Sequence, residues 1–202
     1  MNFLAHAHLS GSNRDVILGN FIADAVKGKK WQEYRQDIQI GIILHRQIDS
    51  YTDNHELFKQ SVNRVRKDFG RYSGIALDIF YDHFLARNWK DYHNDELPIF
   101  AAHVYGTLTR NVLILPYRTK RLLPFLISQN WLTSYAHFDG LKQVFNGMDR
   151  RTGRISGMDT ATDVLIRNYN ELYVDFKDFY PQLIDFSSES LDNLILKIKS
   201  TK

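Results

Sequence analysis

Acidic and histidine side chains lie inside apolar, helix-like segments in the first 83 residues of this 202-residue chain. They are His6, His8, Asp24, His45, Asp49, Asp53, Asp78, Asp82 and His83. A buried carboxylate or imidazole is costly unless it is paired or binds a metal. The chain is therefore constrained to a fold that brings these groups together within an apolar frame.

The length and composition predict one helical domain without a membrane span. A chain of 202 residues is long enough for one large core and short for two domains. Only 4 Pro and 11 Gly interrupt it, so long helices are allowed. No apolar run approaches the roughly 20 residues of a membrane helix, and residues 1–6 lack the pattern of a signal peptide. The absence of Cys excludes a disulfide framework and a thiolate site, and a cytoplasmic location is expected.

Apolar residues recur with a helical period along most of the chain, and strand patterns are nearly absent. The pattern predicts an all-α, single-domain helical bundle over residues 1–202. Helices are expected at residues 2–8, 14–27, 31–51, 54–68, 74–91, 97–113, 119–130, 133–147 and 159–179. Residues 53–56 resemble a capping box, and residues 147–154 are expected to form a loop. Pro181 should start or kink the last segment, and residues 187–202 should dock as an amphipathic tail.

The spacing of acids and histidines predicts a metal centre between helices. His45 and Asp49 lie four residues apart and share one helix face. Asp82 and His83 follow in another predicted helix, and Asp24 stands among apolar residues near the end of a third. Three helices can therefore converge on one cation. Imidazole nitrogen with carboxylate oxygen suits Mn²⁺, Fe²⁺ or Mg²⁺, with zinc as a further candidate.

Several of these residues also have a purely structural interpretation. Asp53 can be a helix N-cap, Asp49 can pair with Arg46 or with a neighbouring helix, and Asp78 can form a salt bridge with an arginine at position 71 or 87. His6 and His8 can be hydrogen-bonded residues of the core. In that case the chain is a non-catalytic helical binding module, in which the acids and histidines form only buried ion pairs and hydrogen bonds.

Several long sequence blocks carry a resemblance to a known family. The blocks are MNFLAH at 1–6, GNFIAD at 19–24 with Lys27-Gly28, GIILHRQID at 41–49 with Thr52-Asp53 and His55, and DIFYDHFLA at 78–86 with Trp89. They resemble the acyl carrier protein phosphodiesterase family in order and roughly in spacing. The resemblance covers about residues 1–90, and the pattern beyond them is looser.

The resemblance implies a fold, an activity and a metal. The family has an α-helical fold distantly related to the HD phosphohydrolases and uses a divalent metal, usually Mn²⁺. Its activity removes the 4′-phosphopantetheine group from holo-acyl carrier protein and leaves the apo protein. This chain has His45 four residues before Asp49, and Asp82 directly before His83, in place of a contiguous His-Asp dyad.

Within this reading, the expected metal ligands are Asp24, His45 and Asp82. Asp49 is expected to orient a ligand or to accept the proton of the attacking water, and Asp24 shares the catalytic role. His83 is expected to act as a ligand or as an acid/base. These assignments require separate helices to bring the side chains to a common point beside solvent.

Basic residues near this centre suggest how an acidic substrate would be held. Arg46 is a candidate for binding the phosphate in a bidentate manner, although a surface salt bridge is the alternative. Acyl carrier proteins are acidic, and Lys27, Lys29 and Lys30 follow Asp24 closely enough to form a basic rim that orients such a partner.

Two further functions compete with the carrier-protein reading. A metal-dependent hydrolase of a nucleotide or small phosphoester would keep the same centre, whereas the binding module described above would not use it.

The net charge is +3, with 23 acids spread among the basic residues, and no nucleic-acid reader motif occurs, so nucleic-acid binding is not expected. Further basic clusters, which can steer an acidic partner, lie at residues 118–121 and 150–154. The oligomeric state is not indicated by the sequence.

Overall fold

The computed structural model describes residues 1–199, and every regular element in this part of the chain is a helix, which confirms the all-α prediction. The α-helices are α1 (Phe3–His8), α2 (Arg14–Ile22), α3 (Gln36–Asn54), α4 (Glu56–Phe69), α5 (Ser73–Arg87), α6 (Leu97–Arg110), α7 (Tyr117–Ser128), α8 (Trp131–Ser134), α9 (Phe138–Arg151), α10 (Ala161–Arg167) and α11 (Tyr169–Lys199). Short 3-10 turns are η1 (Ala23–Ala25), η2 (Lys30–Glu33), η3 (Gly70–Tyr72), η4 (Trp89–Asp91), η5 (Val112–Ile114) and η6 (Met158–Thr160).

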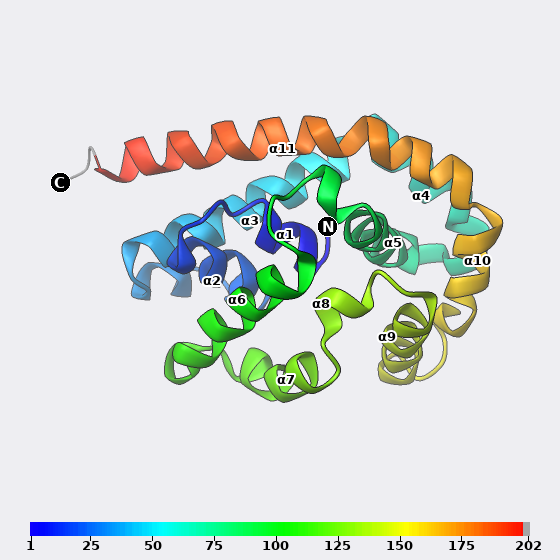
Figure 1. Cartoon of the computed structure of the whole chain (residues 1–202), viewed down its shortest axis with the longest axis horizontal. Coiled ribbons are helices and arrows are strands. Elements are labelled where there is room, and N and C mark those ends of the chain that lie inside the picture. Colours follow the sequence, from blue (N-terminus) through cyan, green and yellow to red (C-terminus); the bar gives the residue numbers. More distant parts are fainter. Residues whose placement is uncertain (200–202) are drawn as a thin grey trace.

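Figure 1 shows α11 along one edge of the molecule, with α1, α2 and α3 beneath it and α7 and α9 at the opposite edge. No helix within residues 1–199 has both the length and the apolar content to cross a membrane.

Helices α2 and α3 cross in direct backbone contact because each carries a glycine at the crossing. A Cβ atom on Gly19 would collide with the carbonyl oxygen of Ile38, and one on Gly41 would collide with that of Val16. Since His45 lies one turn beyond Gly41 on α3, this close approach sets where its side chain stands relative to α2.

Helix α1 is held by a carboxylate from α5. Asp82 is fully buried, and its Oδ2 and Oδ1 atoms accept hydrogen bonds from the backbone N–H groups of Leu4 (2.8 Å) and Ala5 (3.1 Å). The first N–H groups of a helix have no partner within the helix, and a negative charge at this end is favourable. Asp82 therefore anchors α1 and, with it, His6 in the next turn.

Helix α11 is one continuous helix that includes the end of the helix expected at 159–179 and most of the tail expected at 187–202. Pro181 lies inside this helix, so the expectation that it starts a separate segment is wrong, and the alternative that it kinks the helix stays a prediction. Toward its C-terminal end Leu194 is buried, and the Gln36 side-chain amide donates to the carbonyl oxygen of Ile198 at 3.1 Å. The expected amphipathic tail lies within α11 as far as the described chain extends, and its last three residues lie outside the described part.

The predicted capping box is wrong. Helix α3 continues through Asn54, so Asp53 lies inside a helix and is not an N-cap. His55 takes the N-cap position of α4, and its Nδ1 atom accepts a hydrogen bond from the backbone N–H of Leu57 at 3.3 Å. An imidazole nitrogen thus replaces the expected carboxylate.

Two predicted boundaries in the second half are also wrong. The expected loop at 147–154 begins only after residue 151, because α9 continues to that residue. Near the end of α9, buried Asp149 accepts a hydrogen bond from the hydroxyl of Ser156 at 2.8 Å. The expected helix at 159–179 is divided at Asn168, whose side-chain amide donates to the carbonyl oxygen of Val164 at 2.8 Å.

His8 is a half-buried histidine with hydrogen-bond partners at both ring nitrogens. Its Nε2 atom lies 3.1 Å from the carbonyl oxygen of Tyr92, and its Nδ1 atom lies 2.8 Å from the Tyr180 hydroxyl. A carbonyl oxygen only accepts, so Nε2 carries the proton and the tyrosine hydroxyl donates to Nδ1. Burial lowers the pKa of His8 to about 4, because desolvation penalises the charged ring.

Acidification is expected to destabilise the fold through His8. The unfolded histidine takes up a proton near pH 6.5, whereas the folded one does so only near its pKa of about 4. The unfolded state therefore binds more protons between these values, and the free energy of unfolding falls as the pH drops through this window. By pH 5 the loss is about 2 kcal/mol for this one residue.

Urea unfolding at pH 7.5 and pH 5.0 in the presence of EDTA measures this effect. The His8→Gln variant should lose less stability between the two pH values than the wild-type chain does. An equal loss in the two proteins would show that His8 does not contribute to the acid sensitivity.

Candidate active site

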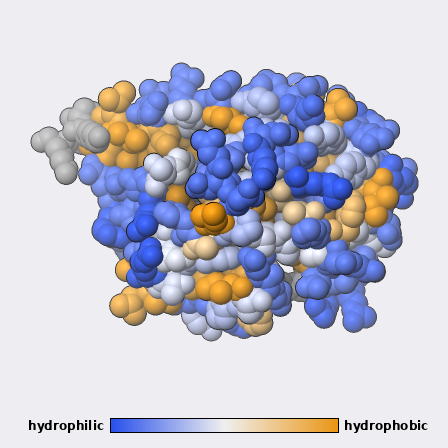
Figure 2. Space-filling view, viewed as in Figure 1, coloured by the Kyte–Doolittle hydropathy of each residue, from blue (hydrophilic) through white to orange (hydrophobic). Residues whose placement is uncertain are grey.

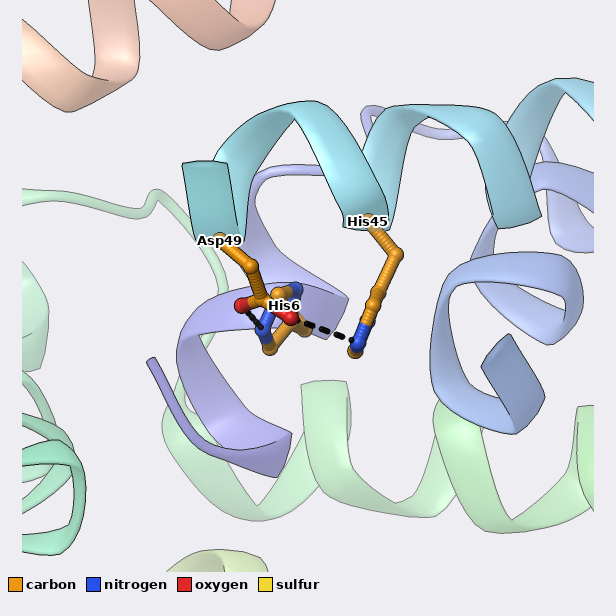
Figure 3. A group of neighbouring side chains, drawn as sticks. All are labelled: His6, His45 and Asp49. Carbon is orange, nitrogen blue, oxygen red and sulfur yellow. Dashed lines mark hydrogen bonds and ion pairs between the residues drawn. The ribbon is translucent and has the colours of Figure 1, made fainter. Parts of the chain in front are cut away.

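Three side chains from α1 and α3 meet beside solvent. Figure 3 shows His6 on α1 and His45 and Asp49 on α3 pointing toward one another. The Nε2 atom of His6 lies 3.1 Å from Oδ1 of Asp49, and the Nε2 atom of His45 lies 3.1 Å from Oδ2. The two imidazole rings stack with their centroids 3.9 Å apart. Each residue offers one ligand atom to a group whose members lie within 4.8 Å of one another, a spacing that suits a metal ion.

Asp24 closes this group on the solvent side. It lies in η1, directly after α2, and its Oδ1 atom is 3.3 Å from Nε2 of His45. The Asp24 side chain is 86% exposed and that of Asp49 is 38% exposed, whereas both imidazoles are buried. The cluster, defined as His6, His45, Asp49 and Asp24, therefore has a buried imidazole side and an open carboxylate side.

Asn20 fixes the orientation of His45. The Nδ1 atom of His45 lies 3.0 Å from the side-chain oxygen of Asn20, which is fully buried on α2. An amide oxygen only accepts, so Nδ1 carries the proton and Nε2 faces the two carboxylates. A hydrogen bond from the far ring nitrogen to an oxygen is the usual support of a metal-binding histidine.

Burial and hydrogen bonds shift the pKa values of all four side chains of the cluster. Burial opposes the charged form of His45, but hydrogen bonds to Asp24 and Asp49 outweigh it and raise its pKa to about 9. The pKa of Asp24 is lowered, mainly by the hydrogen bond from His45. Burial raises the pKa of Asp49, yet bonds from His45 and His6 hold the net value well below the usual range. Burial and, to a smaller extent, the nearby His45 lower the pKa of His6 to about 4. The positively charged His45 ring thus bonds both carboxylates, and the amino group of Met1 lies 3.8 Å from Oδ1 of Asp49.

The structure brings together some of the residues expected from the sequence and leaves others elsewhere. Asp24, His45 and Asp49 meet, as the spacing suggested. Both Asp82 oxygens are instead occupied by backbone N–H groups of α1, and burial raises the pKa of Asp82 to about 7. His83 lies within the core, and its Nδ1 atom is 2.7 Å from the carbonyl oxygen of Tyr135. Neither Asp82 nor His83 belongs to the group of ligand atoms described above.

The expected basic residues are exposed to solvent. Arg46 is exposed, and its Nη2 atom donates to the carbonyl oxygen of Val26 at 3.2 Å, just after η1. Lys27, Lys29 and Lys30 are exposed in the segment that follows Asp24. Their contribution to substrate binding stays a prediction.

Sequence reasoning missed His6 as a member of the cluster. The sequence left open whether His6 is a hydrogen-bonded residue of the core and did not include it among the expected ligands. His6 is buried, and its partner is Asp49 from α3. The signal that could have found it is an imidazole flanked by the apolar residues Leu4, Ala5 and Ala7. Asp78, for which an arginine partner was considered, instead lies 2.9 Å from the amino group of Met1.

Comparison with known proteins agrees with the resemblance in the sequence. A family model described as acyl carrier protein phosphodiesterase matches residues 1–183. Curated relatives of that name include one from Photorhabdus laumondii, 35% identical over 92% of this chain and 94% of its own length. Others are from Yersinia pestis, 35% identical over 91% of this chain and 96% of its own, and from an Enterobacter species, 34% identical over the same shares. No solved structure matches the chain. The chain therefore belongs to the acyl carrier protein phosphodiesterase family.

Proposed function

We propose that this protein is a metal-dependent phosphodiesterase that removes 4′-phosphopantetheine from holo-acyl carrier protein and leaves the apo protein. Membership of the family and the names of the relatives support the substrate and the bond that is broken. The observation that carries the proposal is the cluster of His6, His45 and Asp49, which faces solvent beside Asp24.

The donor set of this cluster fits a divalent cation. Two imidazole nitrogens and a carboxylate oxygen form a borderline to hard ligand set, which suits Mn²⁺ or Fe²⁺ better than a thiophilic metal. His6, His45 and Asp49 would hold the ion, and Asp24 is the fourth candidate because it already bonds His45. We propose Mn²⁺, with Mg²⁺ or Fe²⁺ as alternatives. His6 thus takes the ligand role that the sequence pattern assigned to Asp82.

A bound divalent cation neutralises an anionic diester and lowers the pKa of water toward neutrality. The side chains around the ion would balance its charge, accept a proton and bind the phosphate. His45 must give up its proton when a cation enters, and Asp24 and Asp49 then balance the cation's charge. Asp24, exposed and ionised, can accept a proton from the water that attacks phosphorus. Arg46 stands at the same opening and can hold a phosphate oxygen.

The reaction adds water across one phosphorus–oxygen bond. The bond between phosphorus and the serine oxygen of the carrier protein breaks, the serine oxygen takes up a proton, and the hydroxyl of water stays on the phosphopantetheine. His83 is buried and bonded to a carbonyl oxygen, so we do not assign it a proton-transfer role. A cytoplasmic location, expected from the sequence, is part of the proposal.

Incubation of the purified chain with holo-acyl carrier protein and Mn²⁺ tests this function. Mass spectrometry should show conversion of the holo to the apo carrier protein with release of 4′-phosphopantetheine, and EDTA should abolish it. Nucleotides and small phosphodiesters are assayed in parallel. Hydrolysis of these compounds without any conversion of the carrier protein would refute the proposal and favour a small-molecule phosphohydrolase.

A further inference from the structure

A groove with basic and aromatic walls lies between α7 and α9, apart from the cluster. Its volume is about 890 Å³. On α7 the lining residues Arg118, Arg121, Leu122 and Phe125 follow the spacing of one helix face. The opposite wall includes Arg150 on α9. The two helices thus present facing surfaces with an apolar interior and cationic edges.

Large apolar side chains in and beside this groove are exposed to solvent. Tyr117 is 73% exposed and Phe125 is 56% exposed, and the neighbouring turn η5 adds Leu113, which is 87% exposed. Figure 2 shows hydrophobic surface along this edge of the molecule. Contiguous exposed apolar side chains of this kind mark interaction sites.

The groove is lined by three arginines and by no acidic side chain. The arginines that form ion pairs with acids in residues 1–199 are Arg35, Arg64 and Arg167, none of which is in the groove. Arg121 lies 5.8 Å from the centroid of the Tyr117 ring, and Arg150 also lines an adjoining pocket to which Asp149 and Asp159 contribute. Arg118 and Arg121 on α7 therefore offer the positive charge that an acidic partner would meet, and like-charged proteins would be disfavoured.

The groove is connected to the candidate active site. Helix α7 packs against η1, the turn that carries Asp24. Trp131, in the floor of the groove, lies 6.5 Å from Phe3 of α1 between ring centroids, and Phe3 stacks on Phe21 of α2 at 4.8 Å. The groove is therefore joined to the elements that carry the cluster through α7 and through the Trp131–Phe3–Phe21 contacts.

We propose that the groove between α7 and α9 is the docking surface for an acidic amphipathic helix of the carrier protein. This inference rests on the proposed function for the identity of the partner. The arginines contact acidic side chains of the helix, and the apolar interior receives its hydrophobic side chains, a recognised mode of helix binding. The carrier is held through this surface while its phosphodiester reaches the cluster.

Charge reversal in the groove tests the proposal. Binding of fluorescently labelled apo-carrier protein is measured at low salt for the wild-type chain, for the Arg118→Glu/Arg121→Glu variant and for Arg66→Glu/Lys67→Glu. The last variant makes the same charge change at exposed positions on α4, at the other edge of the molecule in Figure 1. We expect the groove variant to raise Kd by about tenfold or more and the α4 variant to change it by less than about threefold. With holo-carrier protein, the loss should appear as a higher KM.

Three outcomes would overturn the docking surface. If the two variants raise the Kd for apo-carrier protein equally, the effect comes from net charge and not from the groove. If the groove variant binds apo-carrier protein as tightly as the wild-type chain, the partner binds at another surface. Binding of wild-type chain to anionic lipid vesicles, but not to the carrier protein, would show that the groove faces a membrane. If the groove binds apo-carrier protein but the wild-type chain releases no phosphopantetheine, the proposed function fails while the docking surface stands.

Discussion

Replacing Asp49 with Asn is expected to reduce the release of 4′-phosphopantetheine by about 10²- to 10⁴-fold. The two Asp49 oxygens bond both imidazoles of the cluster, at 3.1 Å in each case. An amide has a similar shape but carries no charge, and it can accept on only one atom. The Asn variant should therefore keep the fold yet lose bound Mn²⁺, which elemental analysis after gel filtration would measure.

Asp53 offers a matched control for this substitution. It lies on α3 one turn after Asp49 and is exposed to solvent. Asp53→Asn removes the same charge from the same helix and should leave turnover and metal content close to those of the wild-type chain. An Asp49→Asn protein that binds metal and turns over as fast as the Asp53→Asn control would remove Asp49 from the site.

Gly41→Ala is expected to cost at least about 3 kcal/mol of unfolding free energy, because the added Cβ meets backbone atoms. The Cβ would collide with the carbonyl oxygen of Val16, and a rigid backbone cannot move aside as a flexible side chain can. Helices α2 and α3 must then separate, which also moves His45 away from Asn20 and Asp24. Thermal unfolding of the variant should show a large drop in Tm together with lower activity.

Gly74 provides the opposite case on α5. A Cβ at this helical position meets nothing within 4 Å. Gly74→Ala should therefore stabilise the chain by up to about 1 kcal/mol, since alanine loses less backbone entropy in a helix. Similar Tm values for the Gly41 and Gly74 variants would contradict the role assigned to the crossing of α2 and α3.

The sequence predicted helices well where an apolar periodicity extends over several turns. The hydrophobic pattern places α3, α5 and α6 nearly where the structure has them, because burying one face of a long helix decides its formation. The boundaries failed where a side chain from outside the local pattern satisfies the backbone. His55 caps α4 in place of Asp53, and Pro181 is accepted within α11 although proline usually ends such a pattern.

The site could be predicted only in part because spacing within one helix does not say which helices meet. His45 and Asp49 share a face, and this local relation placed both in the cluster. Whether Asp82 or His6 completes it depends on how α1 docks on α5, which the periodicity does not encode. A buried aspartate among apolar residues suggested a metal ligand, but in Asp82 the same features produce an anchor for backbone N–H groups.

That anchor has a consequence for when the enzyme becomes competent. Helix α1 has six residues, too few to persist on its own, and its first turn is bonded to a carboxylate 78 positions away along the chain. His6 can therefore reach its partners only after this distant segment has arrived. A nascent or partly folded chain, even one already rich in helix, would lack His6 beside Asp49, and we expect it to show no phosphodiester hydrolysis until α1 has docked.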